Sequence, residues 1–131
     1  LEHLDQKEAI DFLKEAHRVL MEGGIIRLVV PGLGKIVQDY AENGDADRFI
    51  ESLHTCVPKP VSFSARLKLL LVGPRQHHWM YDENSLYSLL KRSGFRNAQA
   101  LTGPGDTTIK NPGSLDLCER QEESIYAEAV K

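Results

Sequence analysis

Two short stretches of the sequence carry the side chains best suited to acid–base chemistry and to binding a small molecule. The first is the pair Glu2 and His3. An imidazole titrates near neutral pH, so His3 is the first candidate for a base or for a group that positions a substrate. The second stretch is the densest polar and aromatic cluster of the chain, directly ahead of a predicted helix. Its members are His77, His78, Trp79 and Tyr81.

Both stretches also have a purely structural interpretation. Glu2 and His3 precede a helix, so their side chains can hydrogen-bond to the backbone at the start of that helix. Trp79 and Tyr81 can anchor the core while their polar edges bond to the backbone. Both interpretations stay open at this point.

The spacing of the histidines and cysteines predicts no metal site. His54 and Cys56 lie two residues apart and His77 and His78 are adjacent, but no group has zinc-finger spacing and no HExxH motif occurs. Adjacent residues of an extended segment point to opposite sides. Without a turn between them, only one of His77 and His78 can therefore face a site.

Two glycine-rich stretches are the nearest candidates for a loop that binds phosphate or a nucleotide cofactor. They are GLGK at residues 32–35 and GPGD at residues 103–106. Such a loop follows a strand and opens a helix, and an acidic residue comes at the end of the next strand. The first stretch has no acidic partner strand after it, and the second lies in a long, turn-rich connection. We therefore interpret both as turns.

The elements that must position these residues form an α/β pattern. Asp5 and Glu8 have the spacing of a capping box, and the apolar residues after them predict a helix from about Gln6 to Met21. After a double glycine, the stretch IIRLVV at residues 25–30 predicts a strand that is covered on both faces. A helix packed before a buried strand is typical of α/β proteins.

Further elements follow from apolar spacing and from helix-capping residues. Asp82 can cap a helix that Gly94 ends, and Arg66 and Lys68 favour helix over strand in the ambiguous stretch 62–73. The remaining predictions are helices at about residues 35–42 and 46–56 and strands at about residues 95–101 and 124–130.

The composition predicts one soluble, cytoplasmic domain. A chain of 131 residues with 41% hydrophobic content can bury one modest core. The net charge of -3 indicates no general attraction to nucleic acid or to an anionic membrane. The longest apolar run, residues 69–72, is far shorter than the roughly 20 residues that span a bilayer. Cys56 and Cys118 stand alone, which favours reduced thiols, although a single disulfide stays open.

Four motifs occur in a characteristic order. They are LEHL at residues 1–4, AHRVLMEGGIIRLVVPG at residues 16–32, HHWMYDENSLYSLLKRSGF at residues 77–95 and the alternating strand at residues 124–130. Together they resemble the carboxy-terminal half of a class I S-adenosylmethionine-dependent methyltransferase. In that family EHL follows the fourth strand, GG precedes the fifth, GF leads into the sixth, and the seventh strand is antiparallel.

The resemblance implies an α/β fold that is part of a Rossmann-like methyltransferase domain. Its small mixed sheet would have the order of the family's strands 5, 7 and 6, with covering helices. Residues 1–131 would form a single domain with a helical insert at about residues 45–74. The family's glycine-rich cofactor turn has no counterpart here, and the chain starts at Leu1 rather than at a methionine. We therefore expect a fragment of a longer methyltransferase, inactive by itself.

The resemblance also implies roles at the site, with S-adenosyl-L-methionine as the cofactor of the full-length protein. It places Glu2 and Leu4 at the cofactor and makes His3 and His78 candidates for a base or for positioning the acceptor. The residues expected to shape the acceptor site are Pro31, Gly32, His77, Trp79 and Tyr81. The acceptor is expected to be a small molecule, for example a saccharide precursor, and no metal is expected.

Two further expectations concern partners and function. Without the family's fourth strand, strand 25–30 would lie at an exposed edge, so we expect two copies to pair there as a homodimer. The main alternative function is a non-catalytic interaction domain derived from the same fold. A glycine-rich turn encoded upstream would favour the enzyme, and a start codon just before Leu1 would favour the interaction domain.

Overall fold

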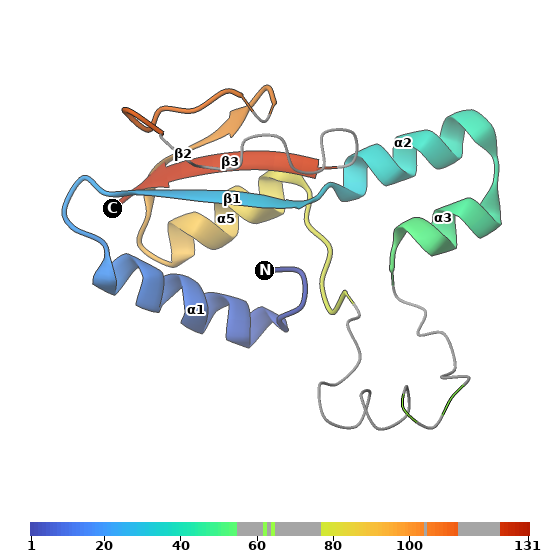
Figure 1. The fold of residues 1–131 in the computed structure, drawn as a ribbon, viewed down its shortest axis with the longest axis horizontal. Coiled ribbons are helices and arrows are strands. Elements are labelled where there is room, and N and C mark those ends of the chain that lie inside the picture. The colour runs from blue at the N-terminus through green and yellow to red at the C-terminus, as the bar shows by residue number, and fades with distance from the viewer. Residues whose placement is uncertain (55–61, 63, 65–76, 104, 113–123) are drawn as a thin grey trace.

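The chain has a mixed α/β structure built around a three-stranded sheet (Figure 1). The computed structural model describes residues 1–54, 62, 64, 77–103, 105–112 and 124–131. Most of the predicted helix at residues 62–73 lies outside these ranges, as does much of the expected insert at residues 45–74. None of the described helices combines the length and the apolar character needed to cross a bilayer.

The last strand of the chain lies in the middle of the sheet. β1 (Ile25–Pro31) and β2 (Arg96–Leu101) flank β3 (Ser124–Val130), which pairs antiparallel with both of them. The predicted order of the three strands is therefore confirmed. The prediction of a mixed sheet is wrong for the described strands, because the central strand runs opposite to both neighbours and no parallel pair of strands forms.

Two helices cover one face of this sheet and form the core with it. α1 (Gln6–Val19) and α5 (Glu83–Arg92) direct their apolar residues at alternate positions of β3. The most buried members of the cluster are Ala9, Leu13, Val30, Leu86, Leu90, Ala127 and Ala129. Burial of apolar surface is the dominant favourable term in folding, so this face supplies most of the stability.

A capping box sets the start of α1, as predicted. The side chain of Asp5 accepts a hydrogen bond from the backbone N of Glu8 at 2.8 Å, and the Glu8 carboxylate accepts one from the backbone N of Asp5 at 2.9 Å. The helix ends at Val19 rather than at Met21. The reason is that Leu20 already has an extended backbone, with φ of -63° and ψ of 146°.

The signals predicted for α5 also set its ends. Asp82 caps the helix by accepting a hydrogen bond from the backbone N of Ser85 at 2.7 Å. Gly94 follows the helix with a φ of 101°, a conformation that other residues rarely adopt. The ring of His17 lies against this glycine and meets Phe95 edge to face at a centroid distance of 5.0 Å. The contact between the His17 ring and the backbone of Gly94 thus joins α1 to the end of α5.

The two helices after β1 form a pair that extends beyond the end of the sheet (Figure 1). α2 (Leu33–Asn43) and α3 (Ala46–Ser52) contact each other through the rings of Tyr40 and Phe49, whose centroids are 4.9 Å apart. α3 ends earlier than predicted. His54 has a φ of 50°, which a right-handed helix cannot accommodate.

The burial of β1 and β3 follows from their places in the sheet. The residues from Ile25 to Val29 are only partly buried, so the expectation that β1 is covered on both faces is wrong. β1 lies at an edge of the described sheet. In β3, by contrast, every residue from Ser124 to Ala129 is buried, because this strand is central and both of its faces are covered.

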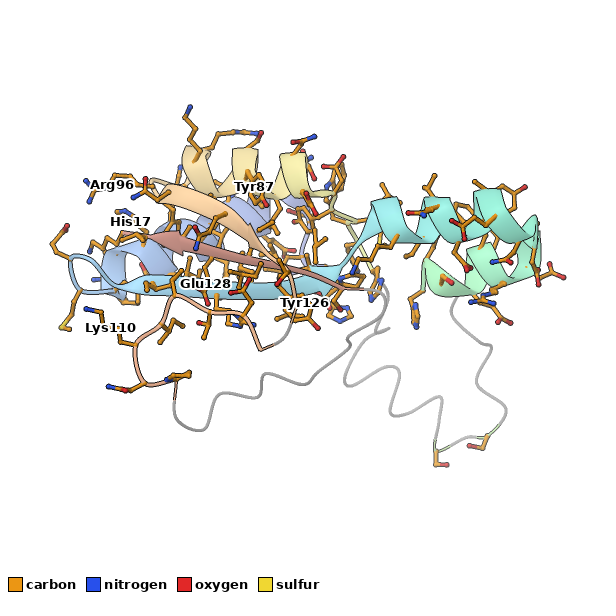
Figure 2. All side chains as sticks on the ribbon, turned by 90° about the horizontal axis from the view of Figure 1, so that it is seen from above. His17, Tyr87, Arg96, Lys110, Tyr126 and Glu128 are labelled. Atoms are coloured by element: carbon orange, nitrogen blue, oxygen red, sulfur yellow. The ribbon has the colours of Figure 1, made fainter. Side chains whose placement is uncertain are left out.

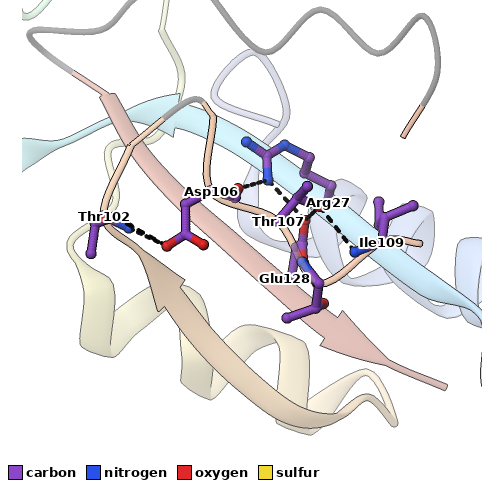
Figure 3. A network of polar contacts seen from close by, with 7 residues as sticks. Arg27, Thr102, Asp106, Thr107, Ile109 and Glu128 are labelled. Atoms are coloured by element: carbon purple, nitrogen blue, oxygen red, sulfur yellow. Dashed lines mark hydrogen bonds and ion pairs between the residues drawn. The ribbon is translucent and has the colours of Figure 1, made fainter. Parts of the chain in front are cut away.

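A buried carboxylate holds the loop after β2 against the second face of the sheet (Figures 2 and 3). Glu128 is 1% exposed and accepts a hydrogen bond from Arg27 Nη1 at 2.8 Å. Its other donors are Thr107 Oγ1 at 2.6 Å, the backbone N of Thr108 at 2.7 Å and Thr108 Oγ1 at 2.5 Å. Burial opposes ionisation of Glu128, but the hydrogen bonds from the threonines and Arg27 outweigh burial and lower the pKa of the carboxyl.

We expect Glu128→Gln to lower the free energy of unfolding at neutral pH by about 3 kcal/mol, because the buried guanidinium of Arg27 then faces a neutral amide. The folded-state pKa of Glu128 lies below its ordinary value of 4.5. The stabilisation by its charge is therefore complete above that value and is lost as the pH falls through the folded-state pKa. Urea unfolding over this acid range measures both effects, and the variant is expected to show the shallower pH dependence.

Glu15→Gln is the matched control for this substitution. Glu15 forms an ion pair with Arg18 at 2.7 Å, but both side chains are exposed, so we expect a change of at most about 0.5 kcal/mol. Equal losses in the two variants would show that the buried network adds nothing specific.

No described strand pairs with the outer edge of β1. An apolar edge strand offers unpaired backbone donors and acceptors to a second chain, and we still expect two copies to pair there. Sedimentation equilibrium is expected to show a dimer, with amide exchange at residues 25–30 slowing as the chain concentration rises. A monomer at all concentrations, with fast exchange at these residues, would contradict the pairing.

Candidate functional site

Three segments meet at the carboxyl end of β1, and they are the ones that the sequence predicted to form a site. The backbone O of Glu2 accepts hydrogen bonds from the backbone N of His78 at 2.7 Å and of Trp79 at 3.1 Å. Just after β1, the backbone N of Leu33 donates to the backbone O of Tyr81 at 2.9 Å. Figure 1 shows the first residues of the chain beside the segment that leads into α5.

A carboxylate and two imidazoles come together where these segments meet. One oxygen of Glu2, Oε1, lies 3.6 Å from His3 Nε2. The ring of His77 meets the ring of His3 edge to face at a centroid distance of 5.2 Å. One potential ligand atom from each of the three side chains lies within 4.8 Å of the others. We call Glu2, His3 and His77 the Glu–His–His cluster.

A third histidine supports this cluster from the end of α3. The ring of His54 stacks on the ring of His77 at a centroid distance of 5.0 Å, and the backbone O of His54 accepts a hydrogen bond from the backbone N of His77 at 3.2 Å. His54 Nδ1 lies 2.9 Å from the backbone O of Ser52. No local sequence pattern predicted this neighbour, because His54 and His77 are far apart in the chain and only the tertiary structure brings their rings together.

The site combines an ionised carboxylate with a neutral imidazole at pH 7. Burial opposes ionisation of Glu2, but a hydrogen bond from its own backbone, the amino group of Leu1 and the nearby His3 together lower the pKa of the carboxyl. Burial, followed by the neighbouring His54, lowers the pKa of His77. A neutral imidazole can accept a proton or bind a metal ion through a ring nitrogen.

The structure separates the two adjacent histidines, as the extended-segment argument predicted for such a pair. His77 is partly buried and belongs to the cluster, whereas His78 is exposed and is not one of its members. His3 is half exposed, with 50% of its side chain accessible. Of the two candidates for a base, His3 is thus the one that lies beside Glu2.

The two aromatic residues of this segment, Trp79 and Tyr81, do not belong to the Glu–His–His cluster. Tyr81 is 3% exposed and belongs to the hydrophobic core, while Trp79 is 39% exposed. Both line a shallow cavity of about 160 Å³ between α1 and α5, together with Ile10 and Leu89. This cavity is smaller than the roughly 300 Å³ at which sites for small molecules begin, so a ligand would need to enlarge it.

The remaining candidate residues are Leu4, Pro31 and Gly32. Their side chains are not part of the Glu–His–His cluster. Leu4 is partly buried and packs against the hydrophobic core. Pro31 and Gly32 are buried at the end of β1, where Gly32 forms a parallel bridge with Tyr81 and precedes α2. Their placement agrees with a role in shaping the site through the backbone.

The chain matches no protein-family model, no curated protein and no solved structure.

The buried hydroxyl of Tyr81 has no hydrogen-bond partner among the described residues, and burial followed by the charge of Glu2 raises its pKa. An unpaired buried hydroxyl costs stability. We therefore expect Tyr81→Phe to raise the free energy of unfolding by up to about 1 kcal/mol, measured by urea unfolding. Tyr87→Phe is the control, because this residue is partly exposed and its hydroxyl can reach water. A loss of stability specific to Tyr81→Phe would show that the hydroxyl does have a structural partner.

Proposed function

We propose that this chain is the acceptor-binding part of an S-adenosylmethionine-dependent methyltransferase. The observation that carries the proposal is the meeting of residues 2–3, the end of β1 and residues 77–81 at one place. Ligands of open α/β sheets bind outside the carboxyl ends of the strands. The β1-β3-β2 strand order agrees with the order of the last three strands in that family, and we propose that this sheet is part of a larger Rossmann-like sheet.

The residues present fit a cationic cofactor in this position. Glu2 is ionised at neutral pH and is 8% exposed, and its Oε2 already pairs with one cationic group, the amino group of Leu1, at 3.0 Å. We propose that Glu2 and the adjoining Leu4 contribute to holding S-adenosylmethionine, which supplies the methyl group as an electrophile when bound.

The proposed work of the chain's own residues is to orient the acceptor and to receive its proton. Methyl transfer is an in-line displacement, so its rate depends on a near-attack position of the acceptor atom. The half-exposed ring of His3 is accessible to an acceptor and can receive its proton, and its Nε2 lies 3.6 Å from the Glu2 carboxylate. His77, held by His54, would fix the position of the His3 ring by edge-to-face contact.

The proposed acceptor is a small molecule, and a saccharide precursor is the specific expectation. The net charge of -3 and the negative charge of Glu2 at the site favour a neutral or cationic acceptor over a nucleic acid. We propose a cytoplasmic location for the enzyme, where the cofactor is made and used.

Calorimetric titration with S-adenosylhomocysteine tests this proposal. We expect no binding by the 131-residue chain and binding by a longer natural protein that contains it together with a glycine-rich cofactor turn. In that longer protein, His3→Gln is expected to reduce methyl transfer by about 100-fold with little change in cofactor affinity, because a positioned base contributes roughly 10²- to 10⁴-fold.

His78→Gln in the same protein is the control, because its exposed ring lies outside the cluster. An equal effect of the two substitutions would contradict the assigned role of His3. Absence of cofactor binding by the longer protein would overturn the proposal in favour of a non-catalytic interaction domain.

A further inference from the structure

We propose that the Glu–His–His cluster is a binding site for a divalent transition-metal ion, with Zn²⁺ as the best fit. Its three side chains supply one carboxylate oxygen and two imidazole nitrogens within 4.8 Å of one another. This ligand set is one that protein zinc sites use, with a further position open to water or to a substrate. The proposal does not depend on methyl transfer, since metal binding needs neither the cofactor nor an acceptor.

The spacing between two of the donor atoms fits a single zinc ion. Donors about 2.1 Å from a tetrahedral zinc ion lie roughly 3.4 Å from each other. Glu2 Oε1 and His3 Nε2 are separated by 3.6 Å, whereas a hydrogen bond between a nitrogen and an oxygen has a usual length near 2.9 Å. A small rotation of the two side chains would bring both atoms to one ion.

His77 provides the second observation in favour of a ligand. Its Nδ1 atom is buried and has no hydrogen-bond partner among the described residues. Buried polar atoms are almost always paired, so a buried ring nitrogen without a partner calls for a ligand.

The surroundings hold these ligands in place before any ion binds. Two backbone NH groups, from His78 and Trp79, donate to the backbone O of Glu2 and fix that residue against the segment that carries His77. The ring of His77 is also stacked on the ring of His54. Supporting contacts of this kind orient ligand side chains in metal sites and raise their affinity.

The nature of the donors selects the class of metal. Imidazole suits zinc, copper, iron and nickel, whereas Ca²⁺ and Mg²⁺ prefer ligands that are all oxygen. We therefore expect binding of Zn²⁺, and of Co²⁺ as its spectroscopic substitute, but no measurable competition by excess Mg²⁺.

The test is a titration of the 131-residue chain with Co²⁺, followed by visible absorption, and displacement of Co²⁺ by Zn²⁺. We expect one ion per chain. His77→Asn, Glu2→Gln and His3→Asn are each expected to weaken binding by at least about 100-fold, since even the loss of an outer supporting contact costs roughly 10- to 100-fold. His78→Asn is the matched control, because this neighbouring histidine is outside the cluster. We expect the affinity of this variant for Co²⁺ to stay within about twofold of that of the unsubstituted chain.

Two further measurements keep the test decisive. His3 is half exposed, so His3→Asn is expected to retain the fold by circular dichroism, and unchanged affinity in that folded variant would overturn the proposal. The amino group of Leu1 lies 3.0 Å from Glu2 Oε2, so the titration is repeated on a chain extended upstream, in which this group becomes an amide. Retained binding supports the proposed site, and loss of binding would assign the metal to the amino terminus instead. The metal test is independent of the cofactor test: if S-adenosylhomocysteine does not bind, the expected affinities for Co²⁺ and Zn²⁺ stay the same.

Discussion

The structure depends on the position of β3 between β1 and β2. The two flanking strands do not pair with each other, so the last residues of the sequence supply all of the backbone hydrogen bonds that join the described sheet. The same strand directs Ile125, Ala127 and Ala129 at the helices and Glu128 at the opposite face. The apolar core and the buried polar network therefore lie on the two faces of one strand, and both require β3 to be in place.

The candidate site is built on backbone contacts in the same way. The backbone carbonyl of Glu2 accepts hydrogen bonds from two NH groups of the segment that precedes α5. The backbone of Tyr81 joins that segment to the end of β1. These bonds do not depend on the identity of the side chains. They hold the backbones of the segments that carry Glu2, His3 and His77 together. One potential ligand atom from each of these three side chains then lies within 4.8 Å of the others.

Among the described residues, the buried carboxylates of Glu2 and Glu128 have different surroundings. Glu128 is enclosed by donors from Arg27, Thr107 and Thr108, which is the arrangement expected of a charge that serves structure. Glu2 instead pairs with the amino group of Leu1 and lies with His3 and His77 in a group of three potential ligand atoms that are within 4.8 Å of one another. The metal proposal rests on that grouping of side chains, and the methyl-transfer proposal rests on the meeting of the three segments.

Local signals in the sequence determined most of the elements. The capping box at Asp5, the cap at Asp82 and the glycine at residue 94 set helix ends within a few residues, because they act through bonds between near neighbours. Motif order also led to the strand order. The sequence did not reveal the full burial of β3, the partial burial of β1 or the early end of α3, since these depend on which strands and loops pack against each element. Nor did it reveal the Glu–His–His cluster. Spacing rules recognise ligands that share a local motif, whereas Glu2 and His77 are far apart in the chain and only the tertiary structure brings their side chains together.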